Sequence, residues 1–389
     1  MMITAFTWTF WTTLALMVFA YVGYPVVIWA LARLRPAPGD VLRSGEEPHV
    51  TLILPAHNER ANIVAKLRNL FALDYPTDRL DIVCVSDGST DGTADLVRQH
   101  GRGRVRLIEL SGRGGKAAAL NAGLEHATAP IVVFSDASIM LEPDSLRRLV
   151  APFADPRVGC VSGEDRIAGS GGEALYGRYE LFLRRQESRL ASIVGASGCF
   201  YAQRRSLCAP FVPGLAPDFL SVLRTVEQGY RALSEPGATG AMTAVTQAGD
   251  EFQRKVRTLL RGMTTLATYR HLLNPLRSPA YSFELFAHKL LRWLVPALMA
   301  VALVANIVLA LEGPFYRGLL SLQVAFYGLA AVGLAGWRPV AGTLPAKAAV
   351  YLVISNAAAA VAWVKFLTGV RQELWNPSQR AHSSGASSS

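Results

Sequence analysis

Polar side chains suited to ligand binding stand directly after short apolar runs in this sequence. Asn58, Asp87 and Asp136 each follow a run rich in valine, isoleucine and leucine, the composition of a buried strand. In a parallel sheet, the carboxyl ends of the strands meet at one edge, and ligands bind in the crevice beyond it. The sequence therefore predicts that these three side chains converge on one ligand site.

A glycine-flanked lysine lies between the two aspartates along the chain. In the stretch Gly112-Arg-Gly-Gly-Lys116, the glycines would let backbone amides approach phosphate oxygens, and the lysine would add positive charge. The stretch is not a Walker A loop, because alanine follows Lys116 where that loop has serine or threonine. No GxGxxG fingerprint of a dinucleotide site follows the first apolar run either. The pattern indicates a nucleotide site of another kind.

Each of these residues also has a purely structural interpretation. Residues 86–93 form the sequence of a good turn, and Thr90 or Asp91 could cap the next helix without any ligand. Asp136 could likewise close an ordinary turn. Because aspartate recurs at equivalent strand ends, with Lys116 between the two positions, the pattern favours a ligand site.

Strands and helices alternate in the segment that carries these residues, 48–240. Strands are expected at 50–55, 80–85, 105–110 and 130–134, and helices at 60–71, at 116–127 and over a stretch that ends near His100. Such alternation predicts an α/β fold with a wound, mostly parallel sheet and flanking helices.

The composition of the whole chain indicates a membrane protein with a sizeable water-soluble part. Of its 389 residues, 51% are hydrophobic and only 17% are charged, where soluble domains carry about a quarter. The four cysteines include no CxxC pair, which excludes a disulfide scaffold and a zinc module. A formal net charge of +10 suggests an anionic partner, but no nucleic-acid-binding motif is present, so no nucleic acid is expected.

Uncharged runs at both ends of the chain are long enough to cross a bilayer. Residues 1–33 predict an uncleaved N-terminal anchor, and the arginines that follow it place the next segment in the cytoplasm by the positive-inside bias. The region 285–369 predicts three more spans, at 293–311, 318–337 and 348–364. The tail, 370–389, ends in small polar residues and is expected to be partly disordered.

Several short motifs in the right order give the chain a resemblance to membrane-bound family 2 glycosyltransferases with a GT-A fold, similar to bacterial polysaccharide synthases. Residues 55–59, Pro-Ala-His-Asn-Glu, match the opening motif of that family, 86–89 match its strand-end aspartate motif, and Lys116 lies in its G-K-x-x-A-L-N run. The resemblance implies that the nucleotide-sugar donor is bound by Pro55, Ala56, Asn58, Glu59, Asp87, Lys116 and Asp136.

Asp136 occupies the first position of the D-x-D motif that binds metal in this family, and Ser138 stands at the second. The resemblance therefore implies Mg²⁺ or Mn²⁺ at Asp136, with the donor diphosphate and water completing the oxygen shell. The metal would neutralise the charge that develops on the leaving group. The loss of the second aspartate makes Ser138 a weaker ligand.

The acceptor side of the resemblance lies further along the chain. Residues 195–204 resemble a family segment beside the acceptor, which places Gly198 and Cys199 there. Asp218 stands six residues before Arg224, as the catalytic base of the family does, although Pro217 replaces the acid that precedes it. The structural alternative for Asp218 is the N-cap of the helix that follows, and a cap and a base are compatible.

Processive members of the family carry a Q-x-x-R-W motif after this segment. Arg254 and Arg257 align with its first and fourth positions and are implied to clamp the diphosphate, whereas Thr258 replaces the tryptophan, which argues against processive synthesis. The region 250–277 is basic and has apolar residues at helical spacing. It predicts either an amphipathic helix on the membrane surface or a helix that packs on the protein core.

Together these features predict an inverting glycosyltransferase that moves a sugar, hexosyl or N-acetylhexosaminyl, from a nucleotide-sugar donor to a glycan or lipid acceptor. A UDP-sugar is the expected donor, membrane lipids are expected partners, and the expected location is the cytoplasmic face of a bacterial inner membrane. The alternative function is a membrane transporter with a regulatory nucleotide-binding domain. A transporter would place ionisable residues or broken helices within its spans.

Overall fold

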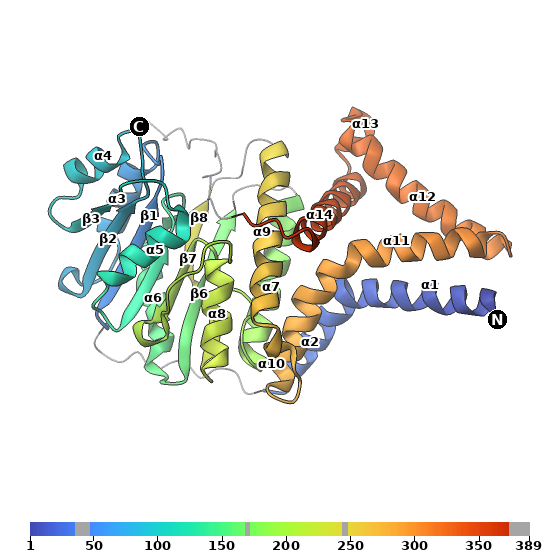
Figure 1. Ribbon diagram of the computed structural model, residues 1–389, viewed down its shortest axis with the longest axis horizontal. Coiled ribbons are helices and arrows are strands. Elements are labelled where there is room, and N and C mark those ends of the chain that lie inside the picture. The colour runs from blue at the N-terminus through green and yellow to red at the C-terminus, as the bar shows by residue number, and fades with distance from the viewer. Residues whose placement is uncertain (36–46, 168–171, 243–247, 373–389) are drawn as a thin grey trace.

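The computed structural model describes residues 1–35, 47–167, 172–242 and 248–372, so the expected disorder beyond residue 372 lies outside the described residues. An eight-stranded sheet in the order β3-β2-β1-β4-β7-β6-β8-β5 forms the centre of the α/β part, which is called the catalytic part below because it carries the residues predicted for the ligand site (Figure 1). Its strands are β1 (Val50–Ala56), β2 (Leu80–Ser86), β3 (Val105–Glu109), β4 (Ile131–Ser135), β5 (Met140–Leu141), β6 (Val158–Ile167), β7 (Phe200–Arg204) and β8 (Arg231–Met242).

Strands β3, β2, β1 and β4 run parallel, as the alternation of elements predicts. β7 then pairs antiparallel with both β4 and β6, while β6 and β8 are parallel to each other. The four predicted strands are confirmed to within a residue or two at their ends. The first helix begins at Ile63 rather than at Arg60, because Asn58 is left-handed (φ 51°) and residues 59–63 form a turn.

Helices cover both faces of the sheet because side chains along each strand alternate between them. Leu52 and Leu54 of β1 pack with α3 (Ile63–Phe71), α4 (Thr93–His100) and α6 (Ser145–Val150), whereas Ile53 packs on the other face. The helices on that second face are α5 (Gly115–Glu125) and α8 (Pro217–Glu227). The short 3₁₀ turns are Thr77–Arg79, Ala151–Ala154, Arg205–Leu207 and Arg270–Leu273.

Four helical segments are long and apolar enough to cross a membrane, as predicted: Met2–Arg33, Pro279–Ala310, Pro314–Leu334 and Leu344–Leu367. The first consists of α1 (Met2–Val18), a π-turn and α2 (Tyr24–Arg33), and the second of α10 (Pro279–Leu285), a π-turn (Phe286–Leu290) and α11 (Leu291–Ala310). The last two are α12 (Pro314–Leu334) and α14 (Leu344–Leu367), with the short α13 (Arg338–Ala341) between them. The second segment starts well before the uncharged run at 293–311, so it also contains Lys289 and Arg292.

The basic region forms α9 (Ala248–Thr268), which stands against the catalytic part beside α14 (Figure 1). Its apolar stripe, which includes Val256, Leu260 and Met263, is buried against side chains of α8 and α14. The core-facing alternative is therefore the correct one for these side chains. The position of the helix relative to a membrane remains a prediction.

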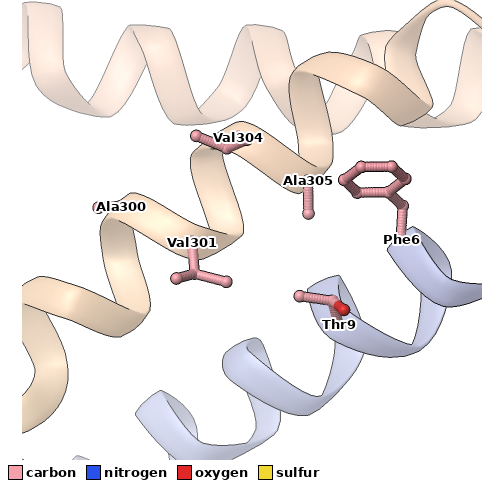
Figure 2. A pocket seen from close by; sticks show the side chains of 6 residues that line it. All are labelled: Phe6, Thr9, Ala300, Val301, Val304 and Ala305. Carbon is pink, nitrogen blue, oxygen red and sulfur yellow. The ribbon is translucent and has the colours of Figure 1, made fainter.

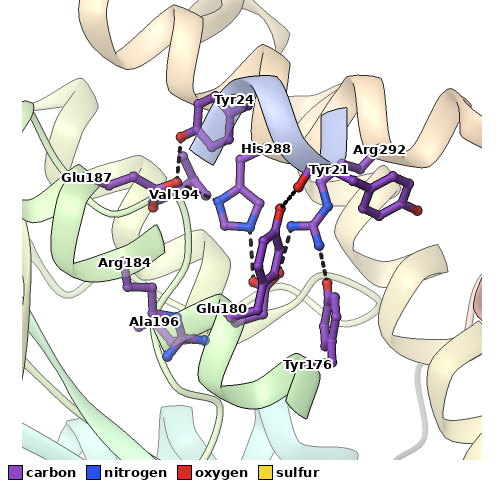
Figure 3. Close-up of polar contacts among 11 residues, drawn as sticks. Tyr21, Tyr24, Tyr176, Glu180, Arg184, Glu187, Val194, Ala196, His288 and Arg292 are labelled. Carbon is purple, nitrogen blue, oxygen red and sulfur yellow. Dashed lines mark hydrogen bonds and ion pairs between the residues drawn. The ribbon is translucent and has the colours of Figure 1, made fainter. Parts of the chain in front are cut away.

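A buried polar network joins the membrane segments to α7 (Gly172–Leu190) (Figure 3). The Glu187 carboxylate accepts hydrogen bonds from the Tyr24 hydroxyl (2.7 Å) and the Val194 amide (3.3 Å), and it lies 2.6 Å from His288 Nδ1. Burial raises the pKa of Glu187, but His288 and Tyr24 outweigh it and hold the pKa below its usual range. Since Tyr24 and His288 come from two different spans, this one carboxylate connects both to the catalytic part.

The network continues through Glu180 on the same helix. Its carboxylate lies 3.0 Å from His288 Nε2 and accepts a hydrogen bond of 2.6 Å from Arg292, which also donates to the Tyr176 hydroxyl (2.6 Å). Burial raises the pKa of Glu180, but Arg292 and His288 hold it well below its usual range. Both glutamates are therefore charged and partnered within the protein.

Replacing Glu187 with alanine should destabilise the whole chain, because it leaves the buried His288 and the Tyr24 hydroxyl without their acceptor. The expected loss is about 3–5 kcal/mol of unfolding free energy, as for a broken buried ion pair. Thermal unfolding in detergent measures it. The control is Asp95→Ala, which breaks an exposed pair with Arg98 (2.6 Å) and should cost about 0–1 kcal/mol. Equal melting temperatures for the two variants would contradict the proposed structural importance of Glu187.

Candidate active site

The loops after β1 and β2 are tied together by the side chains that the sequence predicts at the strand ends. Asn58 accepts a hydrogen bond from the Thr90 amide (2.9 Å), and its own amide donates to Ser89 Oγ (3.2 Å). Glu59 is buried, accepts from the Asn62 side chain (2.8 Å) and lies after Pro55 and Ala56, which are buried in β1. The structure therefore brings these four predicted residues to the edge of the sheet, and their contact with a nucleoside remains a prediction.

Asp87 holds the glycine-rich loop. Its carboxylate is buried and accepts hydrogen bonds from the amides of Gly114 (2.7 Å) and Gly115 (2.9 Å). The next residue, Gly88, has φ 59°, and a Cβ there would lie 2.7 Å from the backbone nitrogen of Arg113. The close approach of the two loops thus requires glycine at 88. Asp87 does more than close a turn, since it orients the start of α5.

Lys116 and Asp136 form an ion pair at the carboxyl edge of the sheet, where the sequence predicts their convergence. Lys116 Nζ lies 2.7 Å from Asp136 Oδ1 and donates to the Gly198 carbonyl at 2.9 Å. Their side chains are only 14% and 15% exposed. Burial lowers the pKa of Lys116, but Asp136 and its other neighbours outweigh burial and raise it, so the lysine is a cation at neutral pH. The Asp136 amide donates to the Cys199 carbonyl (3.0 Å), which brings Gly198 and Cys199 beside this pair.

Asp218 lies on the other side of Gly198. A Cβ added to Gly198 would lie 3.9 Å from Asp218 Cγ, so the carboxylate packs directly against this glycine. The N-cap of α8 is Ala216 and Pro217 begins the helix, which puts Asp218 at its second position. The structural alternative, in which Asp218 is the N-cap, is therefore wrong, because the helix already begins at Pro217, whose fixed φ suits the first helical position. Asp136 and Asp218 thus both lie beside residues 195–199.

Two further carboxylates lie near this segment, on β6. Glu164 is fully engaged by Arg185 through hydrogen bonds of 2.8 and 2.6 Å. Asp165 accepts a hydrogen bond from the Ser197 hydroxyl, and burial raises its pKa although Arg184 opposes the rise. Asp165 is thus a third acid near the centre.

Lys66 supports the loop that follows β4, and the sequence gives only a faint sign of this role. Its ammonium donates to Ser135 Oγ (2.9 Å) and to the Ile139 carbonyl (2.6 Å), which brackets the loop that carries Asp136 and the half-buried Ser138. Burial lowers the pKa of Lys66 to about 7. The available signal is its position on the apolar face of α3, between Ile63 and Leu67.

One arginine of α9 lies close enough to Asp218 to interact with it electrostatically. Arg261 is buried, and burial lowers its pKa to about 10 although Asp218 raises it. Arg257 and Arg254 lie one and two turns before it, and their place at a diphosphate remains a prediction. Arg261 is the cation of this helix that the electrostatics connect to Asp218, and the motif alignment did not single it out.

Two apolar grooves lie among the spans, and no acidic or basic side chain lines either of them. One of about 270 Å³ lies between α1 and α11 (Figure 2). It is lined by Phe6, Thr9, Ala300, Val301, Val304 and Ala305. The candidate active site is instead the group of polar side chains around Gly198.

Comparison with known proteins agrees with this fold. Residues 51–209 match the family model described as glycosyl transferase family 2, so this part of the chain is a family 2 glycosyltransferase domain with a GT-A fold. The chain is 25% identical over 222 residues to poly-beta-1,6-N-acetyl-D-glucosamine synthase of Staphylococcus aureus, covering 54% of this chain and 53% of that protein. The Staphylococcus epidermidis protein of the same name is 25% identical over 167 residues.

The chain spans about half the length of these curated relatives. A solved structure matches more of it: mannosyltransferase PcManGT from Pyrobaculum calidifontis, in complex with GDP-Man and Mn²⁺. The two share 29% sequence identity with a TM-score of 0.70, over 91% of this chain and 97% of that one. The similarity therefore includes the membrane segments as well as the catalytic domain.

Replacing Asp87 with alanine should weaken nucleotide binding, because it releases the amides of Gly114 and Gly115 from their fixed orientation. The dissociation constant for GDP-mannose or a UDP-sugar should rise about tenfold or more, since hydrogen bonds to a charged group contribute about 1.5–3 kcal/mol each. Equilibrium binding to the purified full chain measures it, with Asp81→Ala, an exposed residue of β2, as the control. An unchanged affinity would return Asp87 to a turn-forming role.

Proposed function

We propose that this enzyme transfers a sugar, with inversion, from a nucleotide-sugar donor to a hydroxyl of a glycan or lipid acceptor. The observation that carries the proposal is the convergence of Lys116, Asp136 and Asp218 on Gly198. A cation and a metal-binding carboxylate on one side, with a second carboxylate on the other, is the arrangement that a displacement at an anomeric carbon requires.

The donor is a nucleoside diphosphate sugar. The ammonium of Lys116 is suited to phosphate oxygens. The amides of Gly114 and Gly115 donate to Asp87 and hold the loop that presents this lysine. A UDP-sugar is the expected donor, and GDP-mannose is the second candidate because the mannosyltransferase of similar structure was solved with GDP-Man. Arg254 and Arg257 would clamp the diphosphate from α9, and Asn58 and Glu59 would cradle the nucleoside.

A divalent cation fits the residues at the phosphate end. Asp136 and the Ser138 hydroxyl offer the oxygen ligands that Mg²⁺ and Mn²⁺ prefer. The described residues contain no cluster of three or more metal-binding side chains, so the donor diphosphate and water would supply the other ligands. When bound, the cation would neutralise charge on the diphosphate.

The chain's own residues then divide the chemistry between them. Asp218 takes the proton of the acceptor hydroxyl, whose oxygen attacks the anomeric carbon on the face opposite the nucleotide. The bond to the diphosphate breaks, and Lys116 stabilises the departing charge. Residues 195–199 separate the two sides and position the acceptor, with Gly198 and Cys199 in contact with it.

We place the enzyme in the bacterial inner membrane, with its catalytic domain on the cytoplasmic face. Arginines follow the first span, and nucleotide sugars are cytoplasmic metabolites. The transporter alternative ranks lower, because the ionisable groups in the second span, such as His288 and Arg292, are engaged with glutamates of the catalytic part.

Product analysis tests the function directly. The purified full chain is incubated with Mn²⁺ and each of a panel of UDP- and GDP-sugars, together with extracted bacterial lipids, and the products are identified by mass spectrometry. We expect one donor to yield a glycosylated lipid or glycan. Binding without turnover for every donor would favour the regulatory domain of a transporter.

Asp136→Ala should abolish the effect of metal on donor binding while leaving the fold intact, because the residue lies in a loop and contributes little to the core. Donor affinity of the variant should be equal with Mn²⁺ and with chelator. Titration of labelled donor under both conditions measures this, and Asp81→Ala should retain the metal response. A normal metal response in Asp136→Ala would show that the metal binds elsewhere.

Asp218→Asn should lower kcat by about 10²–10⁴-fold, the usual contribution of a general base. Asparagine is near-isosteric, and Asp218 makes no capping bond, so the melting temperature should hold. Donor affinity should also survive, because the carboxylate lies on the acceptor side of Gly198. If the rate stays within a few-fold of wild type, Asp165 becomes the carboxylate to test next.

A further inference from the structure

Two cations lie beside the start of the 195–199 segment. Lys289 Nζ lies 3.7 Å from the position of a Cβ at Gly195, and 5.9 Å from the ring centre of Phe219. Arg184, on α7, donates a long hydrogen bond of 3.4 Å to the Ala196 carbonyl. Its side chain extends toward Ala196, apart from the two glutamates of the network (Figure 3).

Neither charge is neutralised by an ion pair. Within residues 47–167, 172–242 and 248–372, no hydrogen bond or salt bridge reaches Lys289, and Arg184 has only its bond to Ala196. The glutamates nearest to Lys289 are already occupied, Glu180 by Arg292 and Glu187 by Tyr24, and His288 contacts both. Burying a cation without a direct ion pair is costly, and an anionic ligand in contact with both side chains would offset part of that cost.

Their position is at the boundary between the membrane and the catalytic domain. Lys289 belongs to the second candidate span and lies four residues before its uncharged run. Phe219, which Lys289 faces, directly follows Asp218, and Gly198 lies three residues after Gly195. An anion bound by the two cations would therefore sit on the membrane side of the segment whose other end touches the proposed base.

We propose that Lys289 and Arg184 bind the phosphate of a phospholipid acceptor whose free hydroxyl reaches Asp218; this rests on the proposed function. The hydroxyl oxygen forms the new bond to the anomeric carbon, its proton passes to Asp218, and the bond to the nucleoside diphosphate breaks. The phosphate of the acceptor is unchanged. Lys289 and Arg184 thus select for a lipid with a phosphate and a hydroxyl a few bonds apart.

The test compares acceptors that differ in the phosphate or in the lipid chains. Dioleoyl-phosphatidylglycerol and dioleoylglycerol both carry a free hydroxyl, and only the first carries a phosphate. Glycerol 3-phosphate against glycerol repeats the comparison without lipid. With purified full chain, Mn²⁺ and the donor found to bind, we expect transfer to dioleoyl-phosphatidylglycerol alone.

Lys289→Gln should raise the KM for dioleoyl-phosphatidylglycerol about tenfold or more, with kcat and donor affinity much less affected. Lys289→Arg should restore most of the affinity, and Arg184→Gln should repeat the effect from a different element. The matched control is Lys347→Gln, an exposed lysine near the start of the last span, which should leave the KM unchanged.

The outcomes separate the two proposals. Donor binding is measured first without acceptor, and its absence would overturn both. If the donor binds, three results would overturn the phosphate site alone. These are equal transfer to dioleoylglycerol, no transfer to any of the four acceptors, and an unchanged KM in folded Lys289→Gln and Arg184→Gln. Transfer to glycerol 3-phosphate as efficient as to the lipid would overturn the lipid source.

Discussion

One buried carboxylate determines how the membrane segments and the catalytic domain of this enzyme fit together. Glu187 contacts Tyr24 of the first span, His288 of the second and the amide of Val194, the residue before the 195–199 segment. A charge taken out of water needs several strong partners, and these three come from distant parts of the sequence. The same contacts that offset its desolvation therefore place two spans beside the active site.

The 195–199 segment connects the position of these spans to the proposed catalytic residues. Its carbonyls accept from Lys116 and from the Asp136 amide on the donor side, and Gly198 packs against Asp218 on the acceptor side. In the proposed reaction, the same five residues would therefore position both the donor groups and the acceptor groups. A shift of the spans that moved Val194 would move both sides of the site at once, so the membrane anchorage and the catalytic geometry are mechanically linked.

The sequence predicts well where the polar residues that follow strands lie. Asn58, Asp87 and Asp136 come after β1, β2 and β4, and parallel pairing alone brings those strand ends to one edge of the sheet, which a run of valines and isoleucines is enough to indicate. Lys66 and Glu187 could not be predicted, since each depends on the packing of elements far apart in sequence. The cap expected at Asp218 failed for a local reason, because one proline earlier in the chain moved the start of the helix.

The basic helix α9 shows why an apolar stripe alone leaves its partner open. Val256 and Leu260 repeat at helical spacing, which requires that one face be buried, but lipid and protein satisfy that requirement equally. In this structure protein covers the stripe, because α14, the last span, packs on it. Trp363 of α14 also donates a hydrogen bond to the Trp293 carbonyl of the second span (2.7 Å). The chain after α14 then returns to α9, where Arg261 donates to the Gln372 carbonyl (2.9 Å). The catalytic domain is therefore held by the ends of three spans, which fixes the depth at which a membrane-borne acceptor would meet it.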